Sequence, residues 1–188
     1  MKDEKSNPWQ VKAATTIYSN PWIELTEYKV INPSGGDGIY GKVHFKNLAI
    51  GIIPMDEALN IWLVGQYRFV LNEYSWEIPE GGGAMNTEPL ESAKRELLEE
   101  TGLIAREWKP ILEMHLSNSV SDEHAIVFLA RNLEQHTAAP EDTEQLLIKK
   151  IPFEEAYKMV DEGKITDAIT VAAIFKLKLM LINGQISS

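Results

Sequence analysis

The 188-residue chain contains no cysteine. It therefore has no disulfide framework, no thiolate zinc site and no thiol nucleophile. It also has no apolar run that approaches the roughly 18 residues of a membrane-spanning helix. The N-terminus, MKDEKSNPWQ, is too polar and charged for a signal peptide. The simplest interpretation is a cytoplasmic protein with no membrane partner.

Basic residues are too few to balance the acidic ones. The chain has 18 Lys and Arg against 28 Asp and Glu, which gives a formal net charge of −10. Binding to nucleic acid needs clustered cations that neutralise phosphates, so no nucleic-acid partner is predicted. An anionic substrate stays compatible with this charge if a divalent cation lies between it and the acidic side chains.

Internal repeats and long low-complexity linkers are also absent, and the length suits one domain with a core and a small appended subdomain. Segments rich in β-branched and aromatic residues predict strands at residues 11–19, 22–31, 39–48, 48–55, 59–69, 74–80, 105–116, 125–133 and 145–152. Helices are predicted at about 88–101, 153–163 and 167–184. This order favours an α+β fold, a mixed α/β sandwich, over a regularly alternating parallel sheet.

The helix ends carry recognisable signals. Thr87 is the predicted N-cap of the first helix, and Gly102 suits the left-handed residue beyond its end. Asp167 is the predicted cap of the last helix. In the two C-terminal helices, the apolar positions expected in the core are Val160, Ile169, Ala172, Ala173 and Phe175.

The segment KRELLEETGL, residues 94–103, crowds like charges on a helix. Glu96, Glu99 and Glu100 project from one side of it. The last two also lie near the C-terminal end, where the helix dipole disfavours each carboxylate by up to ~1 kcal/mol. A solvated acidic face is the ordinary explanation. A cation site is favoured here because WEIP leads directly into a glycine run that opens the helix and lets backbone approach a ligand.

Residues 81–103, GGGAMNTEPLESAKRELLEETGL, resemble the Nudix box, Gly-x5-Glu-x7-Arg-Glu-apolar-x-Glu-Glu-x-Gly-apolar. Every fixed position matches except Thr87, which stands where the family has its first Glu. The resemblance implies the Nudix α/β/α sandwich with a mixed sheet. It also implies hydrolysis of a nucleoside diphosphate linked to another group, with Mg²⁺ or Mn²⁺ as cofactor.

The resemblance also assigns roles within the box. Glu96, Glu99 and Glu100 become metal ligands, with a backbone carbonyl at Glu80 or Gly81 as a further ligand. Arg95 orients the glutamates through ion pairs. Gly81 lets the backbone approach the substrate.

Segments outside the box resemble ADP-ribose and other nucleoside diphosphate sugar pyrophosphatases. The first is QYRFVLNEYSWEIPEGG, in which Arg68 would contact a phosphate and Glu77 would hold the sugar or a metal-bound water. The second is SNSVSDEHAIVFLA, where Asn118 and Val120 depart from the usual Pro-Gly turn. There Glu123 would reach a metal or the distal sugar, or would serve only as a loop salt-bridge partner.

The catalytic base of this subgroup comes from an acidic loop before a closing helix. The matching segment here is PEDTEQLLIKKIPFEEA. Glu144 lies at the best-matching position, and Glu141 is the second candidate. The loop could also be acidic for solvation alone.

The N-terminal strands, residues 1–46, resemble a small antiparallel sheet that serves dimerisation and base binding, and residues 47–188 then form the catalytic domain. Tyr18 and Trp22 are the candidates for stacking on a purine, although core or interface packing explains them equally well. A homodimer through these strands is expected.

The leading hypothesis is hydrolysis of a nucleoside diphosphate sugar, such as ADP-ribose or GDP-mannose, to a nucleoside monophosphate and a sugar phosphate. Other nucleoside diphosphate derivatives, NADH or diadenosine polyphosphates, are the alternative substrates. A non-catalytic nucleotide sensor is the alternative from another class, and the intact Arg95, Glu96, Glu99 and Glu100 argue against it.

Overall fold

The computed structural model describes residues 6–138 and 146–186. The chain forms two compact units, one made of residues 1–47 with 115–123, the other of residues 48–114 with 124–188. Each unit is described by itself. No helix within the described residues is long and apolar enough to cross a membrane.

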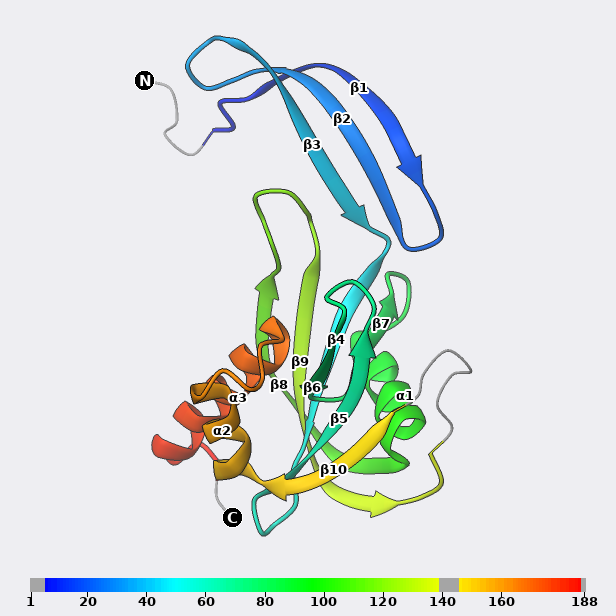
Figure 1. The fold of residues 1–188 in the computed structure, drawn as a ribbon, viewed down its shortest axis with the longest axis vertical. Coiled ribbons are helices and arrows are strands. Elements are labelled where there is room, and N and C mark those ends of the chain that lie inside the picture. The colour runs from blue at the N-terminus through cyan, green and yellow to red at the C-terminus, as the bar shows by residue number, and fades with distance from the viewer. Residues whose placement is uncertain (1–5, 139–145, 187–188) are drawn as a thin grey trace. The chain divides into compact units, whose positions relative to one another are not determined.

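The first unit is a three-stranded antiparallel sheet (Figure 1). Its strands are β1 (Gln10–Ser19), β2 (Ile23–Ile31) and β3 (Asp37–Phe45), with β2 in the middle. This is the small N-terminal antiparallel sheet that the sequence predicts.

The loop of residues 115–123 adds to the edge of β3. Val43 N–H donates to Val120 O at 2.8 Å, and Asp122 N–H donates to Val43 O at 3.2 Å. The carboxylate of Asp122 then accepts hydrogen bonds from Lys42 Nζ, His44 Nδ1 and Phe45 N, at 3.1, 2.8 and 3.0 Å. The loop is therefore anchored by both backbone and side-chain contacts.

The second unit contains two further sheets. One has the order β10-β5-β6, with β5 (Asn60–Arg68) antiparallel to both neighbours, β6 (Glu73–Glu77) and β10 (Leu147–Pro152). The other has the order β7-β4-β9-β8 and comprises β4 (Asn47–Pro54), β7 (Glu80–Ala84), β8 (Leu103–His115) and β9 (His124–Gln135). Because β4 and β9 run parallel while β5 and its neighbours run antiparallel, the unit is mixed.

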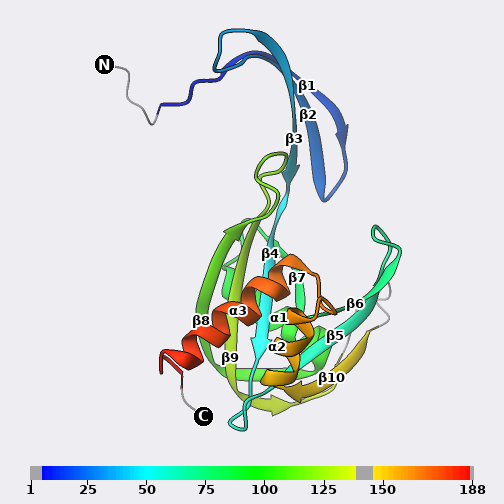
Figure 2. The same cartoon turned by 60° about the vertical axis from the view of Figure 1, so that its left-hand side comes forward.

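Helices cover both sides of these sheets (Figures 1 and 2). Helix α1 (Pro89–Thr101) lies on one side, while α2 (Phe153–Asp161) and α3 (Ala168–Ile182) lie on the other. The predicted α/β/α sandwich is confirmed. The core under α1 is built from small and branched side chains and one aromatic ring: Ile50, Ile52, Ala93, Leu97, Leu103, Ala105, Ile126, Phe128 and Ala130.

Several local expectations need correction. The N-cap of α1 is Glu88, without a side-chain capping hydrogen bond, so the prediction for Thr87 is wrong. Pro89 at the first turn, which lacks an N–H, reduces the need for a cap. Phe175 is 40% exposed and packs edge-on against Tyr157, because the buried face of α3 is formed by Ile169, Ala173, Ile174, Leu177 and Met180.

The charge on Asp122 gives the first unit a pH dependence. Burial alone raises the pKa of Asp122, but hydrogen bonds from His44, Phe45 and Lys42 outweigh it and lower the pKa to about 2, from an ordinary value of 3.8. The hydrogen bonds to Asp122 are therefore at full strength above about pH 4 and weaken as the pH falls towards 2.

Asp122→Asn should lower the free energy of unfolding, measured in urea near neutral pH, by less than ~1 kcal/mol. The effect is small because Asp122 is partly exposed.

That stability difference should shrink as the pH falls from about 4 towards 2, because Asp122 of the unfolded chain takes up a proton near its ordinary pKa of 3.8, whereas Asp122 of the folded protein keeps its charge until about pH 2. A difference that stays constant over this range would contradict the assignment. Asp37→Asn is the control, since Asp37 is a more exposed carboxylate on the same sheet, where it pairs with Lys12.

Candidate active site

The three box glutamates lie on the side of α1 that faces β7. Glu100 is 2% exposed and Glu96 8%, whereas the side chain of Glu99 is about a third exposed. The helix ends at Gly102, which has a left-handed φ of 69°, as predicted. Two carboxylates are thus buried near the end of a helix, where burial and the helix dipole both disfavour charge. Their partners decide whether the arrangement is stable.

Arg95 supplies part of that compensation. Its Nη1 donates to Glu99 Oε2 at 2.7 Å, and its Nη2 donates to Glu96 Oε1 at 2.6 Å and to Gly82 O at 3.0 Å. Partial burial alone would lower the pKa of Arg95, but the charges of Glu96 and Glu99 outweigh it and raise the pKa. Arg95 therefore joins α1 to the glycine run and fixes two glutamates.

Gly81 lies directly against the Glu96 carboxylate. A Cβ built on Gly81 would overlap the carboxylate carbon and both oxygens of Glu96. A side chain fits there only if the Glu96 carboxylate moves away. The glycine that was expected to give a ligand access to the backbone is thus required first by the packing of Glu96.

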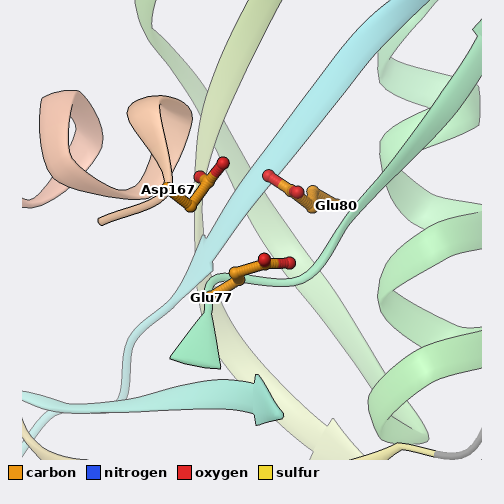
Figure 3. A group of neighbouring side chains, drawn as sticks. All are labelled: Glu77, Glu80 and Asp167. Carbon is orange, nitrogen blue, oxygen red and sulfur yellow. The ribbon is translucent and has the colours of Figure 1, made fainter. Parts of the chain in front are cut away.

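Glu80 connects the box to a second group of acids. Its N–H donates to Glu100 Oε2 at 3.0 Å. Its side chain points the other way, towards Glu77 at the end of β6 and Asp167 at the start of α3 (Figure 3). One oxygen from each of these three side chains lies within 4.8 Å of the others, and among the described residues this is the one group of three acids so placed.

Arg68 is the cation of this group. Its guanidinium binds Glu77 through Nε at 2.9 and 3.0 Å and through Nη2, and it also donates from Nη2 to Glu80 Oε1 at 2.5 Å. One guanidinium faces three carboxylates. The pKa of Glu80 is raised well above its ordinary value, chiefly by burial and then by the charges of Asp167 and Glu77, which Arg68 only partly offsets.

The donor chemistry fits a hard divalent cation. All candidate ligands are carboxylate or carbonyl oxygens, which Mg²⁺ and Mn²⁺ prefer. The Oε2 atom of Glu80 is buried, and no hydrogen-bond donor among the described residues reaches it. A buried oxygen without a donor is costly, and a cation is one means of satisfying it.

The remaining predicted residues are placed as follows. Arg68, Glu77, Glu80 and Gly81 come together with Arg95, Glu96, Glu99 and Glu100 in the second unit. Tyr18, Trp22 and Glu123 belong to the first unit, where Tyr18 is 54% and Trp22 65% exposed. Glu141 and Glu144 lie outside the described residues.

Asp167 was missed as a site residue. Its sequence signal was read as a helix cap, which it is: Oδ2 accepts from Thr170 N–H at 2.7 Å. Nothing in the sequence places it beside Glu77 and Glu80, which lie far earlier in the chain. The one available signal was the charge of Asp167, because an uncharged Ser or Thr would cap the helix equally well.

The family is shown by comparison with known proteins. The Nudix domain model matches residues 45–172, so the chain belongs to the Nudix family. An ADP-ribose pyrophosphatase from Bacillus subtilis (strain 168) is 34% identical over 170 residues, covering 89% of this chain and 91% of its own. One from Mycobacterium tuberculosis (strain H37Rv) is 31% identical over 166 residues, covering 86% and 79%.

A solved structure supports the fold. The crystal structure of an ADP compounds hydrolase superposes with a TM-score of 0.85 and covers 98% of this chain and all of its own. At 16% sequence identity, this similarity concerns the fold alone. The Nudix sandwich predicted from the box is confirmed.

The contact between Gly81 and Glu96 generates a testable expectation. Gly81→Ala should lower the free energy of unfolding by about 1–3 kcal/mol, because the added Cβ forces the Glu96 carboxylate away from Arg95. Urea unfolding measures it. Gly41→Ala on β3 is the control, since a Cβ there meets nothing within 4 Å and its φ is not left-handed. Equal stability of the two variants would show that Glu96 does not occupy this place.

Proposed function

We propose that the protein hydrolyses the pyrophosphate bond of nucleoside diphosphate sugars, with ADP-ribose as the first candidate, to a nucleoside monophosphate and a sugar phosphate. The observation that carries the proposal is the complete set of Arg95, Glu96, Glu99 and Glu100, packed against β7 with Arg95 bridging two of the glutamates. The two ADP-ribose pyrophosphatases that match most of the chain support this choice of substrate.

The cofactor proposed is Mg²⁺, with Mn²⁺ as a substitute. Glu96, Glu99 and Glu100 would hold it, with the backbone carbonyl of Glu80 or Gly81. When bound, a divalent cation neutralises pyrophosphate charge and lowers the pKa of an attacking water. The side chain of Glu80 points instead towards Glu77 and Asp167, where its buried Oε2 would offer a cation a further oxygen.

Arg68 is proposed to bind a substrate phosphate. Its Nε and Nη2 are engaged by Glu77 and Glu80, which fix the plane of the guanidinium. Within the described residues no hydrogen bond uses Nη1, and the side chain is about a third exposed. One edge of a fixed guanidinium is thereby left for an anion. Glu77, which is 2% exposed, then acts mainly by orienting Arg68.

The reaction adds water across the P–O–P bridge. The water oxygen bonds to one phosphorus, the bridging P–O bond breaks, and the bridging oxygen leaves with the other phosphate. The base that takes the water proton is proposed to be Glu144, with Glu141 as the alternative.

The first unit is proposed to bind the nucleoside. Tyr18 and Trp22 present exposed rings suited to stacking on a purine. Glu123, at the end of the loop anchored to β3, is proposed to reach the distal sugar. We also infer a homodimer through the N-terminal strands, supported by exposed apolar side chains such as Val11, Ile17 and Ile39. A cytoplasmic location stays a prediction.

A substrate panel tests the proposed function. With Mg²⁺, ADP-ribose should be hydrolysed faster than GDP-mannose, ADP-glucose, UDP-glucose, NADH and diadenosine polyphosphates, and products formed in ¹⁸O-labelled water identify the attacked phosphorus.

Glu100→Gln is the matched variant. It keeps an oxygen acceptor for Glu80 N–H but loses the charge, so Mg²⁺-dependent turnover should vanish while the fold persists. Turnover of another substrate class by wild type would redirect the assignment, and no turnover at all would favour a nucleotide sensor.

Two further substitutions separate the candidate bases. Glu144→Gln should lower kcat by ~10²–10⁴, the range expected for loss of a general base, while Glu141→Gln should change it little. Steady-state kinetics with saturating Mg²⁺ measure both. The reverse order of effects moves the base to Glu141.

A further inference from the structure

The turn that joins β6 to β7 is held by three different elements. Ile78 N–H donates to Thr170 Oγ1 on α3 at 3.0 Å. Pro79 O accepts from Ile52 N–H on β4 at 2.8 Å. Glu80 N–H donates to the Glu100 carboxylate on α1 at 3.0 Å. Successive residues of one short turn are thus fixed by both helical layers and by the sheet between them.

Thr170 is the point at which α3 holds this turn. Its side chain is completely buried, and its own N–H donates to the capping carboxylate of Asp167. The helix also lies close to β4, because a Cβ on Gly51 would come within 2.9 Å of the Ile169 side chain. With α3 fixed at its first turn, the Thr170 hydroxyl has a fixed place from which to accept the Ile78 hydrogen bond.

Movement of Ile78 would reach the active-site side chains on both sides of it. Glu77 precedes it and holds Arg68, and Glu80 follows Pro79 and contacts both Arg68 and Glu100. Asp167, on the first turn of the same helix, places its carboxylate beside those of Glu77 and Glu80 (Figure 3). The first turn of α3 therefore holds the backbone of this acidic group and also contributes one of its members.

We propose that Thr170 is a positioning residue for the proposed hydrolysis. Its hydroxyl, by accepting the Ile78 N–H, sets the place of the Glu77–Glu80 turn and through it the geometry of Arg68 and Glu80. The hydroxyl is specifically needed, because an apolar side chain of the same shape leaves a buried N–H without an acceptor. The expected effect of Thr170 on catalysis rests on the proposed function, whereas its effect on the position of the Glu77–Glu80 turn does not.

The test uses three variants of Thr170. Thr170→Val removes the hydroxyl and keeps the shape of the side chain. Thr170→Ser and Thr170→Ala form a second pair, whose members differ only in the hydroxyl. In the metal-free protein, hydrogen exchange of the Ile78 amide should become about tenfold faster in the Val and Ala variants, and Ser should restore its protection. Mn²⁺ affinity, measured by electron paramagnetic resonance, should fall about tenfold in Val and recover in Ser. With substrate, kcat should fall by about 10–100-fold with KM changed less than about threefold.

Ile174→Val is the control for general destabilisation. Ile174 is a fully buried apolar residue on the same helix, so its truncation lowers stability without removing a hydrogen bond to the turn. It should leave Ile78 exchange, Mn²⁺ affinity and kcat near wild type.

Equal effects of Ile174→Val and Thr170→Val would overturn the proposal, because the role would then be structural only. Unchanged Ile78 exchange and Mn²⁺ affinity in both Val and Ala variants would also overturn it. If wild type turns over none of the panel while the Val variant still loosens Ile78 and weakens Mn²⁺ binding, the proposed function fails and the positioning role stands.

Discussion

The hydrogen bond from Glu80 N–H to the Glu100 carboxylate is the contact on which the rest of the site depends. Glu100 is almost completely buried near the C-terminal end of a helix, where its charge is disfavoured twice over. A backbone donor from β7 offsets part of that cost, and it also brings the glycine run against α1. Once the two are in contact, a side chain at Gly81 would displace the Glu96 carboxylate, and Arg95 can reach Gly82 O. The geometry of the box thus follows from stabilising one buried carboxylate.

The acidic group of Glu77, Glu80 and Asp167 has more negative charge than Arg68 can neutralise. Three carboxylates lie around one guanidinium, and Arg68 forms ion pairs with Glu77 and Glu80. A buried ion pair contributes little to stability unless every charge is compensated, and three ionised carboxylates around one guanidinium leave two negative charges uncompensated. This excess of negative charge suits a site organised for cations rather than for stability.

The sequence predicted much of this arrangement where the signals are local. The periodicity and Gly102 define α1, and the spacing of Glu96, Glu99 and Glu100 follows from helical geometry. The strand β7 could not be predicted from a glycine run, because glycine has low strand propensity and the pairing is imposed by the neighbouring β4. The association of Asp167 with Glu77 and Glu80 depends on how α3 packs, as does the exposure of Phe175. Neither the place of Asp167 nor the exposure of Phe175 can be predicted from the residues next to it in the chain.

The loop of residues 115–123 has a consequence for the modularity of the protein. The sheet of β1–β3 obtains a further edge partner from a segment that lies far along the chain. This segment also supplies Asp122, which contacts Phe45 across 77 positions. The first unit is therefore discontinuous in sequence. A contiguous fragment ending at Asn47 would lack the loop and leave the backbone groups of Val43 unpaired with it. This N-terminal sheet is consequently not a detachable module: inserting, deleting or transplanting it requires two separate stretches of chain to be carried together.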